Sequence, residues 1–178
     1  MSKNKASRPS EPSRPFEPAG TGLKEEDLEH HEVLTVAYQP MVKYAWATGV
    51  AIGRFLDGLK AGEILGTKCD HCGRIAVPPR IFCEWCFKRS GTWIKLPDTG
   101  TVNTFSISYI TTDTTRVKTP TIPAVIEIDS AGHAGFLHII GEAKPEEVRI
   151  GMHVKAVWAD PEKRKGSITD IKHFKPIR

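Results

Sequence analysis

Two pairs of cysteines, each spaced Cys-x-x-Cys, constrain the fold of this chain more than any other feature of its sequence. Cys69 and Cys72 form the first pair, Cys83 and Cys86 form the second, and the chain has no other cysteine. Two intervening residues allow a tight turn to direct both thiolates at one ion, and two such turns complete a tetrahedron. The pattern therefore predicts a metal site, with Zn²⁺ bound by all four thiolates.

Two other uses of the cysteines compete with a metal. Disulfides require an oxidising compartment, and the polar start of the sequence lacks the apolar block of a secretory signal. A redox Cys-x-x-Cys motif usually occurs once, at the start of a helix in a thioredoxin-like setting that is missing here. His71 is a further possible ligand, but with four thiolates at hand we interpret it as a solvated turn residue. Four thiolates leave no open coordination position, so we expect the zinc to be structural.

The turns that carry the two pairs differ in their chemistry. Gly73 follows the first pair and supplies the permissive backbone that such a turn often needs. Phe87 follows the second pair, so we expect that turn to be less regular. The intervening stretch GRIAVPPRIF is short enough to form a hairpin, with Pro78-Pro79 stiffening its return.

Before the cysteines, apolar residues recur every three to four positions between Met41 and Lys60, which predicts a helix that ends near Gly58 or Gly62. Because this helix is apolar on more than one side, it either packs on its own domain or docks on another protein. The preceding residues are polar. Proline recurs at every third position up to residue 22, as in polyproline II, and residues 23–32 are charged and compatible with a helix.

After the cysteines the apolar period falls to two, which is typical of β-strands. Strand-like runs cover 101–112, 121–129, 135–141, 151–159 and 166–174. In the first run, Phe105, Ile107 and Tyr109 share a face that we interpret as core. Five such strands suit a small closed barrel of the OB type. The predicted fold is mainly β with an N-terminal helix: a rubredoxin-like zinc ribbon followed by a five-stranded OB-fold barrel.

These observations divide the chain into four parts. We expect a flexible N-terminal tail over residues 1–40, a docking helix over 41–63, a zinc ribbon over 64–95 and an OB-fold domain over 96–178. No segment is apolar enough to predict a membrane span, and we expect a cytoplasmic protein.

Motifs of self-sufficient catalysis are missing from the sequence. It contains no Gly-x-Ser-x-Gly elbow, no Walker loop and no His-Glu-x-x-His, and every thiol belongs to the predicted metal site. Asp129, Ser130 and His133 crowd into one tight turn, and His138 has the setting of a satisfied core or edge histidine. We therefore assign no catalytic residue.

The order of helix, four-cysteine ribbon and five-stranded barrel resembles the family of zinc-ribbon/OB-fold proteins associated with acyl-CoA enzymes. The resemblance covers roughly residues 41–178, and Glu84 departs from it where such ribbons commonly place proline. It rests on the stretches FLDGLKAGEILGTKCDHCGRIAVPPRIFCEWC, LPDTGTVNTFSISYI, IPAVIEID, IGMHVKAVW and HFKPI.

The resemblance implies a function that the residues alone do not show. Members resemble accessory subunits of thiolases, so it implies a thiolase-like catalytic subunit as partner and an acyl-CoA substrate, or coenzyme A, at the interface. It further implies a role in anaerobic aromatic (toluene) degradation. Basic loops at Arg116/Lys118 and at residues 163–165 offer contacts to coenzyme A phosphates, unless they are solvated turn charges. The alternative is an OB-fold module for single-stranded nucleic acid or tRNA, against which a net charge of only +4 argues.

Overall fold

The computed structural model describes residues 24–30 and 45–177. The chain divides into a unit over residues 1–44 and a unit over residues 45–178. In the first unit, only the short helix α1 (Glu25–Glu29) and its two flanking residues are described. The predicted tail over residues 1–40, including its proline repeat, otherwise lies outside the described residues.

Helix α2 (Gly49–Ala61) opens the second unit and is shorter than its sequence pattern suggested, because residues 45–48 have no regular structure. Its end is well defined. Gly62 adopts φ +80°, its N–H donates to the carbonyl of Leu59, and the N–H of Glu63 donates to the carbonyl of Gly58. This is a Schellman motif, which closes helices at a glycine in the left-handed conformation.

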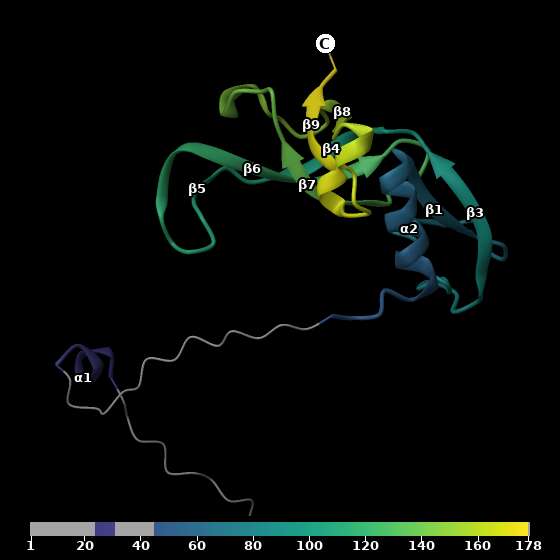
Figure 1. Cartoon of the computed structure of the whole chain (residues 1–178), viewed down its shortest axis with the longest axis horizontal. Helices are drawn as coiled ribbons and strands as arrows, with labels where there is room; N and C mark the ends of the chain where they lie inside the picture. The colour runs from purple at the N-terminus through teal and green to yellow at the C-terminus, as the bar shows by residue number, and fades with distance from the viewer. Residues whose placement is uncertain (1–23, 31–44, 178) are drawn as a thin grey trace, which may run out of the picture. The chain divides into compact units, whose positions relative to one another are not determined.

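Three antiparallel strands follow α2 and form the ribbon sheet: β1 (Ile64–Cys69), β2 (Ile75–Ala76) and β3 (Ser90–Leu96). Their order is β2-β1-β3, with β1 central. Figure 1 shows α2 lying against this sheet, between it and the barrel. Phe55 of α2 packs edge-to-face on Phe136 of the barrel, with ring centroids 6.2 Å apart. The helix therefore joins ribbon and barrel through one apolar core.

Five strands close the barrel. They are β4 (Thr99–Phe105), β6 (Arg116–Ile128), β7 (Gly135–Ile140), β8 (His153–Trp158) and β9 (Ile171–Pro176). Pairing runs β4-β6-β7-β9-β8 and returns to β4, and only the β7–β9 pairing is parallel. A five-stranded closed barrel of this kind is the predicted OB fold. The fold class is thus confirmed.

The barrel core is formed by side chains that alternate along the strands, as the period of two predicts. The completely buried positions include Val102, Ile126, Val154, Ile171 and Phe174. Three short 3₁₀ helices connect or precede strands: η1 (Pro145–Glu147), η2 (Pro161–Lys163) and η3 (Ile168–Asp170). The predicted strand over 166–174 therefore starts late, because η3 occupies its first half.

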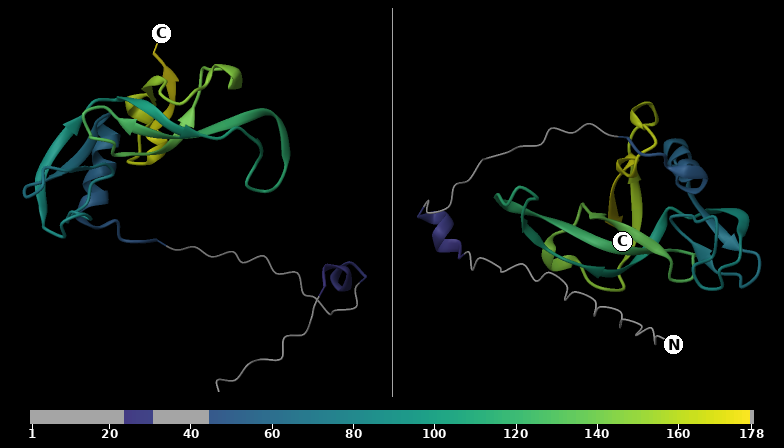
Figure 2. Two further views of the ribbon diagram at one scale, coloured as in Figure 1. Left: turned by 180° about the vertical axis from the view of Figure 1, so that it is seen from behind. Right: turned by 90° about the horizontal axis from the view of Figure 1, so that it is seen from below.

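The prediction of one continuous strand over residues 101–112 was wrong. It is split into β4 and a short strand β5 (Ser108–Ile110), which pairs with the start of β6 in an arm that leaves the barrel (Figure 2). The register of β4 on β6 shifts between Val102 and Thr104, which changes the side that faces the core. Ile107 and Tyr109, interpreted as core, are 38% and 48% exposed.

Candidate metal centre

The four cysteines lie together at the end of the ribbon. Their sulfur atoms are all within 4.8 Å of one another, and the Cys69–Cys86 and Cys72–Cys83 sulfur pairs are each 3.6 Å apart. A tetrahedral zinc site with bonds of about 2.3 Å has sulfurs about 3.8 Å apart. The spacing therefore fits one tetrahedral metal ion held by all four sulfurs, as in a zinc ribbon.

Each cysteine pair lies on a turn of the same geometry. In the first turn the N–H of Gly73 donates to the carbonyl of Cys69, and in the second the N–H of Phe87 donates to that of Cys83. Gly73 has φ +72° and Phe87 has φ +56°. The expectation of a less regular second turn was wrong: Phe87 takes the left-handed conformation despite its side chain, which is uncommon for a bulky residue.

The backbone of the second turn favours a negative charge on the sulfur of Cys83. The N–H groups of Cys86 and Trp85 donate to Cys83 and lower the pKa of its thiol to about 7. The N–H of Lys88 acts in the same direction on Cys86, but burial and the neighbouring sulfurs, first that of Cys69, outweigh it and raise the pKa of Cys86 to about 11. Four sulfurs this close cannot all be thiolates unless a cation compensates their charge, which is the role of the metal in such a site.

Three polar contacts hold the loops around the cluster. The buried Thr67 hydroxyl donates to the carbonyl of Arg80 at 2.9 Å and accepts from the N–H of Arg80 at 3.0 Å. The Thr92 hydroxyl donates to Asp70 at 2.6 Å. The Arg80 guanidinium pairs with Glu84 at 3.0 Å, so the residue that departs from the family pattern has a partner within the ribbon. Sequence reasoning missed Thr67, because an ordinary threonine in a strand gives no signal of such a role.

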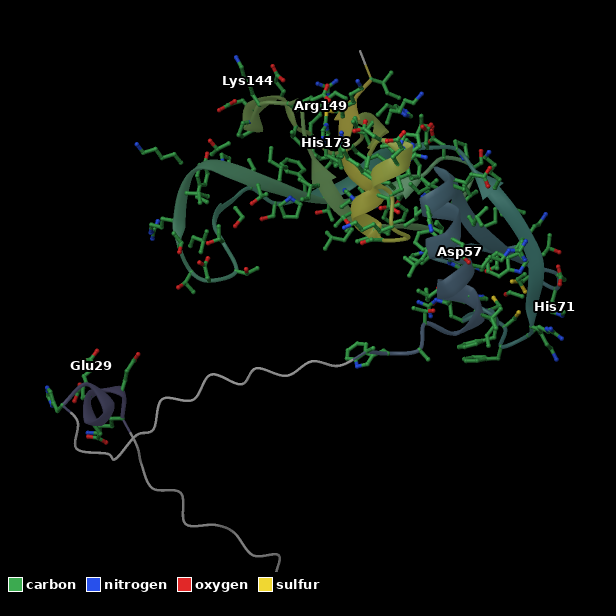
Figure 3. The ribbon with its side chains drawn as sticks, viewed as in Figure 1. Glu29, Asp57, His71, Lys144, Arg149 and His173 are labelled. Atoms are coloured by element: carbon green, nitrogen blue, oxygen red, sulfur yellow. The ribbon has the colours of Figure 1, made fainter. Side chains whose placement is uncertain are left out.

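His71 is exposed on the first turn, as the sequence indicated, and Figure 3 shows it on the outer side of the ribbon. A cation lies across the two turns: the Arg74 guanidinium stacks 4.1 Å from the centroid of the Trp85 ring. The two turns are therefore connected by a cation–π contact as well as by their sulfurs.

Exposed apolar side chains gather around the cluster and the start of α2. We call this set the ribbon patch, and its strongly exposed members are Val50, Ile81, Phe82, Trp85 and Phe87, at 75%, 58%, 47%, 68% and 79%. A groove of about 520 Å³ runs between the start of α2 and residues 78–82. Phe55 in the middle of α2 and Leu59 in its last turn are buried in the core. Among the described residues, the helix thus packs on its own domain from its middle onward, and its start is exposed.

Asp129, Ser130 and His133 lie close together in the β6–β7 turn, as predicted, but they do not form a catalytic triad. The Thr99 hydroxyl donates to Asp129 at 2.5 Å, whereas His133 Nδ1 pairs with Glu127 at 3.0 Å. His138 is 8% exposed and is satisfied as predicted: its Nδ1 accepts from the N–H of Ile139 at 2.8 Å. None of these groups is arranged for nucleophilic catalysis.

Of the two basic loops, one is engaged within the chain. Lys163 pairs with Asp160 at 2.9 Å, and the Arg164 side chain donates to the carbonyl of Ala159 at 2.8 Å. Arg116 and Lys118 lie exposed on β6.

The outer face of β6 and β7 has aliphatic side chains between Thr121 and Glu127. It carries Pro123, Val125, Leu137 and Ile139, while the aromatic Phe136 of β7 is buried on the inner face. OB folds that bind single strands stack bases on aromatic side chains of this face. The barrel therefore does not present such a stacking surface on these two strands.

Comparisons with known proteins agree with this architecture. A family model described as the ChsH2 rubredoxin-like zinc ribbon domain matches residues 56–90, and one described as the ChsH2 C-terminal OB-fold domain matches residues 93–159. A DUF35 domain-containing scaffold protein of Methanocaldococcus jannaschii is 32% identical over 117 residues, which cover 64% of this chain and 82% of that protein. This chain belongs to the DUF35 family.

Further relatives share the fold. A DUF35 scaffold protein of Methanothermobacter thermautotrophicus is 28% identical over 54% of this chain and 71% of that protein. A Sulfolobus solfataricus protein of unknown function from the DUF35 family superposes with a TM-score of 0.53 at 29% identity, over 61% of this chain and 78% of that one. A structure described as the Ltp2-ChsH2(DUF35) aldolase has a TM-score of 0.53 at 15% identity, over 78% of this chain and 98% of the matched one. A separate question is whether the protein spans a membrane. In the described part of the chain, no helix is long and apolar enough to do so.

Proposed function

We propose that this DUF35 chain is a non-catalytic zinc-binding subunit of an acyl-CoA thiolase or related acyltransferase complex. The observation that carries the proposal is the gathering of all four cysteines of the chain in one cluster. Thiolytic chemistry needs an activated cysteine nucleophile with acid–base help, and this chain has no thiol outside the cluster. The nucleophile then belongs to a catalytic partner. The naming of DUF35 relatives as scaffold proteins, and of one neighbour as an Ltp2-ChsH2(DUF35) aldolase, supports a role in an assembly.

In this proposal Cys69, Cys72, Cys83 and Cys86 are the zinc ligands, and residues 64–95 form the zinc module ahead of an OB-fold domain over 96–178. The zinc is structural, because four thiolates fill its coordination sphere. Zinc would hold the two turns at the spacing that presents Phe82 and Trp85 outward. The subunit works in the reducing cytoplasm, where free thiols remain available to the metal.

The ribbon patch is the docking surface for the catalytic partner. Large exposed apolar side chains rimmed by polar groups mark protein–protein interfaces, and aromatic residues are enriched there. Between residues 74 and 89 the ribbon contains Arg74, Arg80, Lys88 and Arg89 against Glu84, but Zn²⁺ with four thiolates adds a charge of −2 and brings this region close to neutral. We therefore expect the contacting segment of the thiolase-like chain to be mainly apolar, with few acidic side chains.

The barrel then shapes the entrance for the acyl-CoA, and its exposed cations Arg116 and Lys118 are available to the phosphates of coenzyme A. The substrate class in this proposal is an aromatic acyl-CoA of anaerobic toluene degradation, with the thiolase of 2-benzoylsuccinyl-CoA as the candidate complex.

Co-purification from the native source followed by mass spectrometry tests the proposal. We expect a thiolase-sized companion to be recovered in a fixed ratio with zinc-containing wild-type chain. Recovery of the chain alone contradicts the proposal, and recovery with RNA or single-stranded DNA that dissociates at moderate salt favours the nucleic-acid alternative.

A pair of variants locates the interface. Ile81→Glu places a charge in the ribbon patch, whereas Ile150→Glu makes the same change at a similarly exposed isoleucine before β8; their exposures are 58% and 67%. We expect Ile81→Glu to weaken recovery of the companion about tenfold or more, as hot-spot substitutions do, and Ile150→Glu to leave it unchanged. Equal recovery with both variants would move the interface away from the patch.

A further inference from the structure

The four sulfurs are not equally accessible, and the difference follows from the barrel. A cleft of about 700 Å³ lies between the ribbon and the β6–β7 turn, and it is lined by Cys72 and Cys83 together with Arg74, Arg80 and residues 130–134. Cys69 and Cys86 do not belong to its lining. Cys72 and Cys83 therefore border an open space that a small molecule can enter, and Cys72 is the exposed one of the two.

Cys72 is the one cysteine of the four that is exposed, whereas Cys86 is half-buried, Cys83 is 7% exposed and Cys69 only 1%. The sulfurs of Cys72 and Cys83 are 3.6 Å apart, and a disulfide bond needs about 2.05 Å. The two turns need to approach by only a small amount to bond. Reactive cysteines occur at partly exposed positions next to cations, and Arg74 and Arg80 line the same cleft, together with Glu84, the ion-pair partner of Arg80.

We propose that the Cys72–Cys83 pair is a peroxide-sensitive modification site, at which oxidation forms a disulfide between the two turns and releases the metal. This inference rests on the proposed zinc site, and it goes beyond the structural role of that zinc. The oxidant is hydrogen peroxide or an alkyl hydroperoxide that enters through the cleft.

The chemistry balances with peroxide as the only co-reactant. The Cys72 thiolate attacks the terminal peroxide oxygen, the O–O bond breaks, hydroxide leaves from hydrogen peroxide or an alkoxide from an alkyl hydroperoxide, and Cys72 becomes a sulfenic acid. The Cys83 thiolate then attacks that sulfur, forms the S–S bond and displaces hydroxide. The two sulfurs together lose two electrons, and the peroxide gains them. Two of the four metal ligands are lost, so the metal is released and the turns no longer hold the ribbon patch in place.

The site can be mapped directly in the zinc-loaded, full-length chain. Trypsin cleaves after Lys68, Arg74, Arg80 and Lys88, so Cys69 and Cys72 lie in the peptide CDHCGR, and Cys83 and Cys86 lie in IFCEWCFK. After limited peroxide and alkylation of the remaining thiols, we expect these two peptides to be joined, with the alkyl groups on Cys69 and Cys86. Zinc release, followed with a chromogenic chelator, should match the appearance of this species. A first disulfide within one turn, or between Cys69 and Cys86, overturns the inference.

Two matched variants test the choice of sulfur without removing the metal. Cys72→His and Cys86→His each convert the site to three cysteines and one histidine, a set that binds zinc in many structural sites. We expect peroxide-driven zinc release to be about tenfold or more slower in Cys72→His, which lacks the accessible thiol, than in Cys86→His, which has the same number of cysteine ligands. Equal rates in the two variants overturn the inference. Zinc content measured before oxidation separates the two proposals: a wild-type chain without zinc contradicts the proposed function, whereas a loaded chain that oxidises elsewhere contradicts only this inference.

Discussion

The ribbon and the barrel are both small β structures, but different forces hold them together. The barrel strands close on one another around a core of completely buried side chains such as Val102, Val154 and Phe174. The far end of the ribbon has four sulfurs where a core would be, and it exposes Ile81 and Trp85 to solvent. A small module cannot bury enough apolar surface to be stable by itself, and metal ligation is a common substitute. Because metal ligation can hold the ribbon turns without an apolar core, the apolar side chains of these turns are free to contact a partner.

The largest expected effect is the loss of the metal site. Cys83→Ser removes one of the four proposed zinc ligands, and structural zinc in small finger peptides contributes about 10–16 kcal/mol to folding. We expect the turns and strands β1–β3 to lose their amide protection in hydrogen exchange, while the barrel strands β6–β9 keep theirs. His71→Ala, next to a ligand but exposed, is the control and should leave both regions unchanged. Loss of amide protection throughout the barrel would contradict the expectation that the barrel is stable without the metal site.

A smaller effect is expected from the barrel core. Phe174 is completely buried and packs edge-to-face on Phe136 with ring centroids 6.2 Å apart. Phe174→Ala should lower the free energy of unfolding by about 3–5 kcal/mol in urea denaturation, because it deletes a large core side chain. The control is Phe82→Ala in the ribbon patch, where the side chain is 47% exposed. A comparable loss in both variants would show that the patch is part of the core after all.

The smallest of the three effects is expected from the buried carboxylate of Asp170, in η3. Burial would raise the pKa of Asp170, but the backbone N–H groups of Lys165, Ser167 and Gly166 donate to it, and the net shift lowers its pKa. Because the folded pKa lies below the unfolded value of about 3.9, the carboxylate stabilises the fold above that pH, and this contribution is lost as the pH falls through the folded pKa.

Asp170→Asn should therefore lower the free energy of unfolding by about 1.5–3 kcal/mol at pH 7, because it removes charge-assisted hydrogen bonds. The gap to wild type should narrow when both are unfolded in urea at pH 3. A gap that is independent of pH would mean that geometry, and not charge, is what Asp170 contributes.

Local patterns predicted most of the elements correctly. The runs over 135–141 and 151–159 correspond to β7 (Gly135–Ile140) and β8 (His153–Trp158), because strict alternation reports a half-buried strand directly. The break between β4 and β5 was not predicted, because the alternation continues through it. Tyr109 is exposed because β5 pairs with the first part of β6, in the arm that leaves the barrel. Phe87 shows a second limit: its left-handed backbone follows from the turn that holds Cys83 and Cys86, although its residue type disfavours it.

The spacing of the cysteines by itself predicted that each pair lies on one tight turn, because a Cys-x-x-Cys turn is a local structure. The two turns meet because β1 pairs with β3 in the ribbon sheet. The alternation of apolar residues likewise determined that a barrel follows. Only the tertiary structure decided which sulfurs solvent reaches and which apolar side chains stay uncovered. Cys72 faces a cleft because the distant turn at residues 130–134 lines its other side. The accessibility of a cysteine depends on segments far away in the chain, whereas the geometry of a single Cys-x-x-Cys turn depends on residues adjacent in sequence.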